Sequence, residues 1–220
     1  MEARGLPAAV LAAASDRRGG ALEVAATALD GLLEVADDPT LLEQAVTSLV
    51  AGQPAMAPVW HLAQAARAPD PPAALAALRR DLATDADAAV AAATSWLQDR
   101  LTARPGSVAT VSHSSLVDRV LARVGPQSAP GDPVVGVVGA DAIGPEGLLN
   151  AVGTRELVGR VPTLVVATAV KLVPAEVFGR LGGAGFEVVP LEAVAAVVVG
   201  AEVLSPAEAG RRAGDLAPPA

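Results

Sequence analysis

The chain has 220 residues, a length that suits one large domain or two small ones. Its net charge is −8, and its basic residues are scattered instead of forming the clustered stripe that nucleic acid requires, so we expect no nucleic-acid role. The absence of cysteine excludes disulfides, thiolate metal sites and a cysteine nucleophile.

The apolar composition does not predict a membrane protein. Mean hydropathy is +0.44, but the longest apolar stretches, 161–170 and 191–201, contain Pro, Thr or Glu and are shorter than the ~20 residues that span a bilayer. Asp16, Arg17 and Arg18 interrupt the N-terminal apolar run, so we expect no signal peptide and a cytoplasmic protein. With only 2% aromatic residues the core must consist of Ala, Val and Leu, and oligomerisation is one way to bury more surface.

Helical periodicity dominates the first hundred residues. Apolar residues recur with a period near 3.6, which predicts helices over 21–35, 41–51, 58–68 and 73–101. Thr40 with Glu43 three residues later matches a capping box and marks Thr40 as the N-cap of the second helix. The long fourth helix is open to an interruption near Thr84.

The pattern changes at Arg104-Pro105-Gly106, after which β-branched runs alternate with helical segments. The predicted strands are 107–112, 133–138 and 163–168, with extended segments at 186–189 and 194–199, and the predicted helices are 114–123, 148–159 and 175–181. Such alternation is typical of a mostly parallel sheet that helices cover on both faces. We therefore expect an α/β protein with a helical subdomain over 1–103, an α/β domain over 104–204 and a frayed tail over 205–220.

Candidate chemistry follows the strand 133–138, because ligands of parallel sheets lie beyond the carboxyl ends of the strands. Gly139-Ala140-Asp141 places an acid at such an end, and Asn150 is expected at a helix N-terminus, where free N–H groups attract anions. The alternative is an ordinary turn with a capping aspartate and glycine bends. Periodicity alone leaves both interpretations open.

Several segments resemble one known family and occur in its order. Gly139–Ile143 with Gly147, Asn150, Gly153 and Thr154 resembles the "GAD…G…N…GT" segment of the initiation factor 2B alpha/beta/delta family, which includes ribose-1,5-bisphosphate isomerase and methylthioribose-1-phosphate isomerase. Four further matches are 15–21 to "SDRxSGA", 53–58 to "RPxMxPL", 111–115 to "THSxSS", and 162–174 to "PFYVVA…KF".

The resemblance implies a fold, a ligand class and an assembly. The fold is an N-terminal helical subdomain followed by a Rossmann-like domain of the NagB/RpiA/CoA-transferase type, and the assembly is a homodimer. The implied ligand is a phosphorylated small molecule, without a cofactor. The implied catalytic residues are Asp141 and Ser114, and the implied ligand-binding residues are Gly20, Ala21, Gln53, His113, Asn150, Gly153, Thr154 and Lys171.

The sequence also departs from the family pattern. The catalytic Cys falls at or next to Ser114, the phosphate-binding Arg is Gln53, and the Lys after the family Asn is Ala151. A βαβ segment between the "THSxSS" strand and "GAD" is missing, so the Rossmann-like domain is trimmed. These departures leave three hypotheses: a protein that binds a phosphorylated sugar or nucleotide without efficient turnover, an aldose–ketose phosphate isomerase that uses Asp141, and a structural interaction protein.

Other candidates are ambiguous. His113 is either a pocket residue or a structural histidine, His61 is most simply a surface or packing residue, and Lys171 either contacts an anion or is a solvated surface lysine. Two histidines in separate halves of the chain predict no metal site. Neither GxGxxG nor a Walker sequence is present, so the Rossmann-like fold does not imply NAD or ATP.

Overall fold

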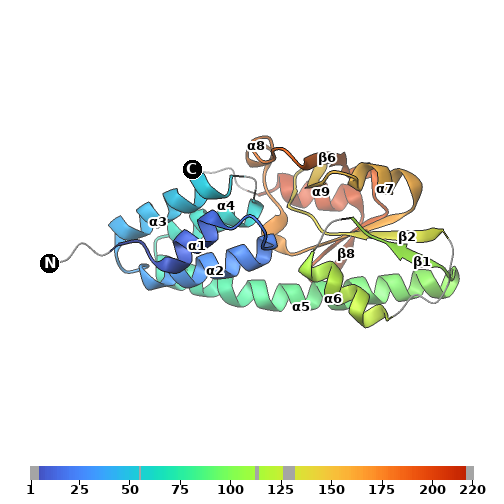
Figure 1. Cartoon of the computed structure of the whole chain (residues 1–220), viewed down its shortest axis with the longest axis horizontal. Coiled ribbons are helices and arrows are strands. Elements are labelled where there is room, and N and C mark those ends of the chain that lie inside the picture. Colours follow the sequence, from blue (N-terminus) through green and yellow to red (C-terminus); the bar gives the residue numbers. More distant parts are fainter. Residues whose placement is uncertain (1–4, 55, 112–113, 126–131, 217–220) are drawn as a thin grey trace.

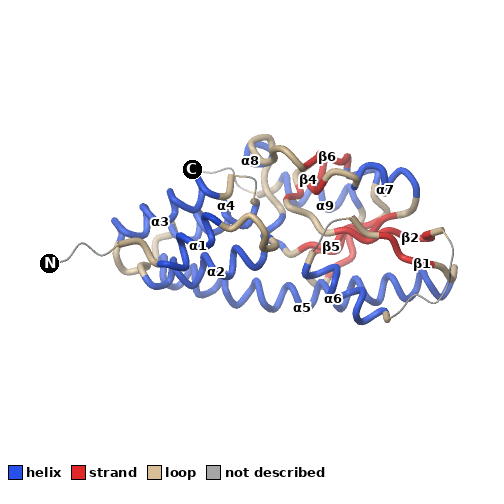
Figure 2. Tube along the Cα trace, viewed as in Figure 1, coloured by secondary structure: helices blue, strands red, loops and turns tan. Residues whose placement is uncertain are grey.

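The computed structural model describes residues 5–54, 56–111, 114–125 and 132–216. A bundle of helices adjoins a layered α/β part, and the strands gather in the latter (Figures 1 and 2). The bundle consists of α1 (Ala8–Ser15), α2 (Ala21–Glu34), α3 (Pro39–Gly52), α4 (Ala57–Ala66) and the first half of α5 (Pro71–Ala103). The helices predicted over 21–35, 41–51, 58–68 and 73–101 are therefore confirmed.

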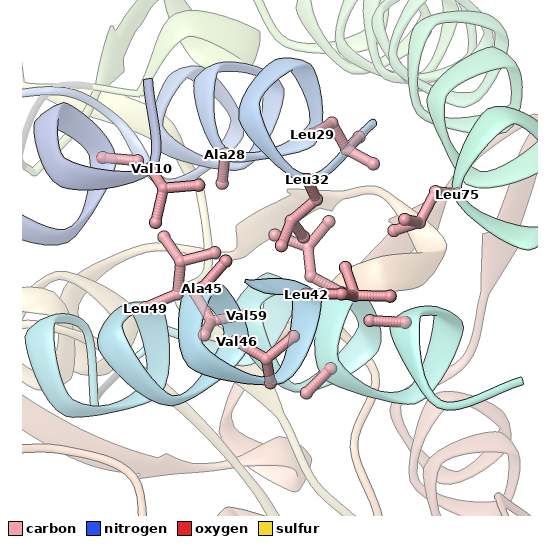
Figure 3. Close-up of a cluster of buried hydrophobic side chains, with 14 of the residues drawn as sticks. Val10, Ala28, Leu29, Leu32, Leu42, Ala45, Val46, Leu49, Val59 and Leu75 are labelled. Atoms are coloured by element: carbon pink, nitrogen blue, oxygen red, sulfur yellow. The ribbon is translucent and has the colours of Figure 1, made fainter. Parts of the chain in front are cut away.

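Small and medium-sized aliphatic side chains fill the bundle core, as the composition predicts (Figure 3). Val10 of α1, Leu32 of α2, Leu49 of α3 and Leu75 of α5 are at most 1% exposed. Truncating such a leucine to alanine costs about 2–5 kcal/mol, because the cavity that is left collapses only in part.

The N-terminus of α3 lies earlier than the capping box predicted. The N-cap is Asp38, whose carboxylate accepts hydrogen bonds from the N–H groups of Thr40 and Leu41, each at 3.1 Å. Pro39 occupies the first helical position, where its fixed φ fits and its missing N–H is not needed. The assignment of Thr40 as the cap was wrong because aspartate caps at least as well and precedes a proline here.

Helix α5 runs without a break through Thr84 and joins the two parts of the molecule. Leu75 packs into the bundle, whereas Ala89, Val90 and Leu97 pack under the sheet. In Figure 1 this helix passes beneath both parts. The predicted division at residues 103 and 204 remains a prediction, since α5 contributes to both cores.

The main sheet has the order β1-β2-β5-β7-β8. Its strands are β1 (Ser107–Ala109), β2 (Pro133–Val138), β5 (Thr163–Ala167), β7 (Ala196–Val199) and β8 (Glu202–Leu204). The first four are parallel and β8 is antiparallel to β7, so the predicted mostly parallel sheet is confirmed. Within the described residues no helix is both long enough and apolar enough to cross a membrane.

Helices cover both faces of the sheet, and the side chains of one strand alternate between them. Leu164 and Val166 of β5 pack against α5 and α6 (Ser115–Val124). Val165 and Ala167 point to the other face, which α7 (Thr154–Arg160) and α9 (Pro206–Gly214) cover. The continuous apolar runs in the sequence follow from this burial on both sides.

A second, antiparallel sheet replaces part of a predicted helix. It has the order β3-β4-β6, with β3 (Ala142–Ile143), β4 (Gly147–Ala151) and β6 (Phe186–Pro190). The helix predicted over 148–159 was wrong in its first half, because Leu149 pairs with Val188 and the helix begins only after Gly153, which has φ 103°. A short apolar run does not distinguish a strand from a helix by periodicity alone.

The segment after Leu204 is an ordered helix through Gly214, not a frayed tail. The hydroxyl of Ser205 caps α9 by accepting a hydrogen bond from the N–H of Glu208. Ala209 and Ala213 are fully buried against the sheet, and Arg212 pairs with both carboxylate oxygens of Glu202 at 2.7 Å. The short elements η1 (Ala169–Lys171), α8 (Ala175–Phe178) and η2 (Leu191–Ala193) complete the described chain.

Candidate functional site

A cavity of about 680 Å³ lies where the bundle meets the carboxyl edge of the sheet. Three neighbouring parallel strands, β1, β2 and β5, end here, and their following segments supply Ser114, Asp141 and Lys171 to its wall. The bundle supplies the opposite wall from the α1–α2 loop and the end of α3. This volume is within the range of small-molecule sites.

Asp141 lies at the tip of β2, as the sequence predicts. Its backbone N–H donates to the carbonyl oxygen of Leu149 at 2.9 Å, which fixes the turn against β4. Burial raises the pKa of the Asp141 carboxyl, and the positive charge of Lys171 offsets part of that rise. Among the described residues no cation lies within 4.0 Å of this carboxylate, so no salt bridge occupies it. A carboxyl group with a raised pKa is suited to proton transfer.

Lys171 ends the short helix η1 that follows β5. The side chain is only 5% exposed, and burial lowers its pKa to about 8 despite the charge of Asp141. Its ammonium group has no hydrogen bond or ion pair with any described residue. Lys171 is therefore a buried cavity residue, and the interpretation as a solvated surface lysine is wrong.

Asn150 lines the cavity from a strand, not from the helix N-terminus that we expected. It belongs to β4, is 3% exposed, and donates from Nδ2 to the hydroxyl of Thr154 at 3.0 Å. That hydroxyl in turn donates to the carbonyl oxygen of Ala151 at 2.7 Å. Thr154 lies outside the cavity wall and orients the Asn150 amide, so its connection with the site is indirect.

The N-terminus of α7 is already occupied by an anion of the protein. The carboxylate of Glu187 accepts hydrogen bonds from the N–H groups of Gly153 and Arg155, at 2.9 and 2.8 Å. Gly153 has no place in the cavity wall. Glu187 takes the N–H of Gly153, and the hydroxyl of Thr154 is bonded to Asn150 and to Ala151. The ligand-binding roles of Gly153 and Thr154 stay predictions, and neither residue lines the cavity.

Two other helix N-termini face the cavity. Gly20 and Ala21 begin α2, and Ser114 precedes the first turn of α6. The Ser114 side chain makes no capping hydrogen bond and lies beside Gly139, where an added Cβ would come within 2.7 Å of its Oγ. The N–H of Gly20 already donates to the carboxylate of Glu23 at 3.2 Å, so at α2 the free donors begin with Ala21. Free N–H groups at helix ends favour an anionic ligand.

Gln53 borders the cavity, but its amide group holds the bundle together. Nε2 donates to the carbonyl oxygens of Ala13 and Asp16 at 2.7 and 2.6 Å, and the side chain is 6% exposed. Both amide hydrogens are thus used within the protein. Gln53 ties the end of α1 to the end of α3 and has no hydrogen left to donate to a ligand.

Arg17 and Arg18 are cavity residues that our sequence analysis did not select. Arg17 donates to the carbonyl oxygens of Ala14 and Asp16 at 2.9 Å, whereas the exposed guanidinium of Arg18 has no hydrogen bond or ion pair with a described residue. Two N–H groups bind the carboxylate of Asp16, which lowers its pKa and shapes the loop. The match of segment 15–21 to the family motif could have indicated both arginines, but we selected only its glycine and alanine.

Of the two histidines, only His61 lies within the described residues. Of the two predicted roles for His61, surface or packing, the structure shows packing: its Nε2 lies 2.8 Å from the carbonyl oxygen of Leu172, and burial lowers its pKa. It connects α4 to the segment that carries Lys171. His113 lies outside the described residues. Within the described ranges no group of three or more His, Asp or Glu side chains is arranged to hold a metal ion.

Solved structures share this fold. The chain matches a translation initiation factor eIF-2B of Pyrococcus horikoshii OT3 with a TM-score of 0.68 and 18% identity, over 91% of this chain and 98% of that one. It matches eIF2B beta from Chaetomium thermophilum with a TM-score of 0.66 and 13% identity, over 94% and 88%. It matches 5-methylthioribose 1-phosphate isomerase from Pyrococcus horikoshii OT3 with a TM-score of 0.59 and 14% identity, over 93% and 85%.

The resemblance that the motifs indicated is therefore confirmed at the level of the fold, an α/β fold with a helical N-terminal part. No family model matches the sequence. No curated protein matches it either.

Proposed function

We propose that this chain, which has the fold of initiation factor 2B subunits, is a cytoplasmic protein that binds a phosphorylated sugar or nucleotide without efficient turnover. The proposal rests on one observation. A cavity of about 680 Å³ contains a half-buried acid, Asp141, and a buried base, Lys171, which neither pair with each other nor bond to another described side chain. Buried polar groups without partners are costly unless a ligand uses them.

The phosphate group would bind on the bundle side of the cavity. The N-terminus of α2 at Gly20 and Ala21 and that of α6 after Ser114 converge there, and Arg18 adds a free guanidinium. Arg18 supplies a cation that the substitutions at Gln53 and Ala151 remove elsewhere. Asp141 and Asn150 lie on the sheet side, where hydroxyl groups of a sugar would find an acceptor and an amide.

Thermal stability in the presence of ligands tests the proposal. We expect ribose 5-phosphate, ribose 1,5-bisphosphate or a nucleoside monophosphate to raise the melting temperature, because a ligand at 100 times its Kd stabilises by about 2.7 kcal/mol. The shift should shrink in Arg18→Ala and in Asp141→Asn. Arg123→Ala is the matched control, since Arg123 is an exposed arginine at the far end of α6. No shift with any phosphate would contradict binding and favour a structural interaction protein.

An aldose–ketose phosphate isomerase is the second candidate. The raised pKa of Asp141 favours it, since a carboxyl that holds its proton nearer neutral pH can move protons between adjacent sugar carbons. By the family resemblance the catalytic thiol falls at or next to Ser114, whose hydroxyl is a weaker proton donor, and this argues for slow turnover. NMR of a sugar phosphate incubated with the protein would detect the second isomer, and Asp141→Asn should abolish its formation.

A homodimer is the assembly that we propose. One neighbour of the fold is the tetrameric eIF2B-beta2-delta2 complex from C. thermophilum, matched with a TM-score of 0.66 and 14% identity. The core of this chain is rich in alanine, and association would bury further apolar surface. Light scattering coupled to size-exclusion chromatography measures the mass directly, and a monomer at micromolar concentration would contradict the proposal.

A further inference from the structure

Lys171 is the only lysine among 220 residues, and its surroundings are unusual for a lysine. The side chain is 5% exposed, lines the cavity, and bonds to no described acceptor. Lysines are rarely buried unless they are paired. A structural role in an ion pair does not account for it, because no carboxylate of the described residues lies within 4.0 Å.

This environment favours the uncharged amine. Burial without a salt bridge makes the ammonium form costly, and a pKa of about 8 leaves roughly a tenth to a fifth of the amine neutral near physiological pH. A neutral, desolvated lysine amine is a nucleophile toward carbonyl carbon. The Asp141 carboxyl interacts with it electrostatically across the same cavity, so an acid is present within range of the same ligand.

We propose that Lys171 forms an imine with the free aldehyde or ketone of an open-chain phosphorylated sugar, and that Asp141 transfers the protons. This inference rests on the proposed function, because the phosphate is what would hold the sugar in the cavity. It narrows the ligand class to phosphates that carry a carbonyl group. Sugar alcohols and locked rings would bind without reacting.

The step balances with groups that are present. The amine nitrogen attacks the carbonyl carbon, the carbonyl oxygen takes a proton from Asp141, and the nitrogen loses a proton, which gives a neutral carbinolamine. Asp141, reprotonated from that nitrogen, then protonates the hydroxyl group, the carbon–oxygen bond breaks, and water leaves. The product is a protonated imine, and no oxidant, reductant or metal is required.

Reductive trapping tests the inference. The protein is incubated with ribose 5-phosphate and sodium cyanoborohydride, which reduces the imine to a stable secondary amine, and peptides are mapped by mass spectrometry. We expect an adduct at residue 171 that is absent from Lys171→Arg. In Asp141→Asn the adduct should form at least about tenfold more slowly, as expected for the loss of a general acid.

Controls separate a built site from random modification. Arg123→Lys places a second, exposed lysine in the same chain, and it should be labelled much more slowly than Lys171. Ribose without phosphate should label Lys171 weakly, and ribitol 5-phosphate, which has no carbonyl group, should protect it. Equal labelling of the two lysines would overturn the inference.

The thermal-shift measurement distinguishes the two ideas. If ribose 5-phosphate raises the melting temperature but no adduct forms at Lys171, the imine is wrong and the binding function stands. If it causes neither a shift nor an adduct, both fail for this ligand class. Should Lys171→Arg fail to fold, peptide mapping of the wild-type chain and of Arg123→Lys still decides the question.

Discussion

The carboxylate of Glu187 lies at the first turn of α7 and accepts a hydrogen bond from the backbone N–H of Gly153 at 2.9 Å. The same oxygen accepts from the N–H of Arg155, and Arg155 reaches back to the carboxylate at 3.8 Å and to the carbonyl oxygen of Val188. Glu187, on strand β6, thereby occupies the N–H groups at the N-terminus of α7, which the sequence had suggested as part of a ligand site. An internal anion of this kind excludes an external one.

Removing that carboxylate should destabilise the protein without weakening ligand binding. We expect Glu187→Ala to lower the free energy of unfolding by about 1–3 kcal/mol, because it takes a charged acceptor away from two backbone donors. Urea denaturation measures the change. Glu156→Ala is the control, since Glu156 is exposed and its one partner among the described residues is Arg160 at 3.6 Å, and it should cost less than about 1 kcal/mol. Loss of ligand binding in Glu187→Ala with its fold intact would contradict our assignment of Glu187.

Gln53 should behave as a structural residue. Gln53→Leu removes the donor to the carbonyl oxygen of Ala13 and one of the two donors to that of Asp16, which keeps its bond from Arg17. We expect a loss of about 1–3 kcal/mol in the free energy of unfolding. Gln44→Leu on the exposed side of α3 provides the comparison and should change stability by less than about 0.5 kcal/mol. If the two variants were equally stable, the amide of Gln53 would not hold the bundle as described.

The stability of the protein should rise between pH 8 and pH 10.5. Lys171 has a pKa of about 8 in the folded chain and an ordinary value of 10.5, so in this window the unfolded chain binds more protons, and raising the pH favours folding. The difference of about 2.5 corresponds to about 3 kcal/mol. The sequence contains no tyrosine and no cysteine, so no side chain of these types titrates in the same range.

Denaturation of the wild type and of Lys171→Met across this window measures the effect. The methionine variant should show a flatter profile and should be more stable than the wild type at pH 7, because it no longer buries a charge. A profile for the wild type that falls with pH, or one that matches the variant, would show that Lys171 is not buried as described.

The charge of Asp141 should influence the pKa of Lys171. Its negative charge raises the pKa of the lysine, so Asp141→Asn should lower that pKa below about 8. Reductive methylation with ¹³C-formaldehyde gives the single lysine an NMR signal that can be followed against pH. An unchanged titration would mean that the two groups do not sense each other across the cavity. Asp70→Asn, at the N-cap of α5 and away from the cavity, serves as the control.

Periodicity predicted α2 to α5 because helical contacts are local, but it missed α1, whose residues are almost all apolar and show no stripe. The same reasoning failed at Leu148 and Leu149, where an apolar run that reads as helix pairs with β6 about forty residues later, a contact that no local pattern encodes. It failed again after Leu204, where a frayed tail was predicted. Ala209 and Ala213 are too small to give a clear apolar pattern, and their burial depends on the sheet face against which they pack.

The residues of the candidate site were likewise predicted only in part. Asp141 and Lys171 were predictable because each follows a parallel strand, and strand ends meet at one edge of a sheet, whereas Ser114 came from the family resemblance. Arg18 was missed because it is exposed and sits on a loop of the other half, which only the tertiary fold brings to the cavity. Nor could the sequence reveal that Glu187 takes the amides of α7 or that Gln53 is fully used, since both depend on contacts between distant segments.

Helix α5 places Leu75 in one core and Leu97 in the other without a break between them. Because one helix contributes to both cores, unfolding of one core would remove part of the packing of the other. We therefore expect calorimetry to record one transition for the whole chain, not a separate one for each half. A ligand bound in the cavity between the two parts would then raise the free energy of unfolding of the whole chain, not of one part alone.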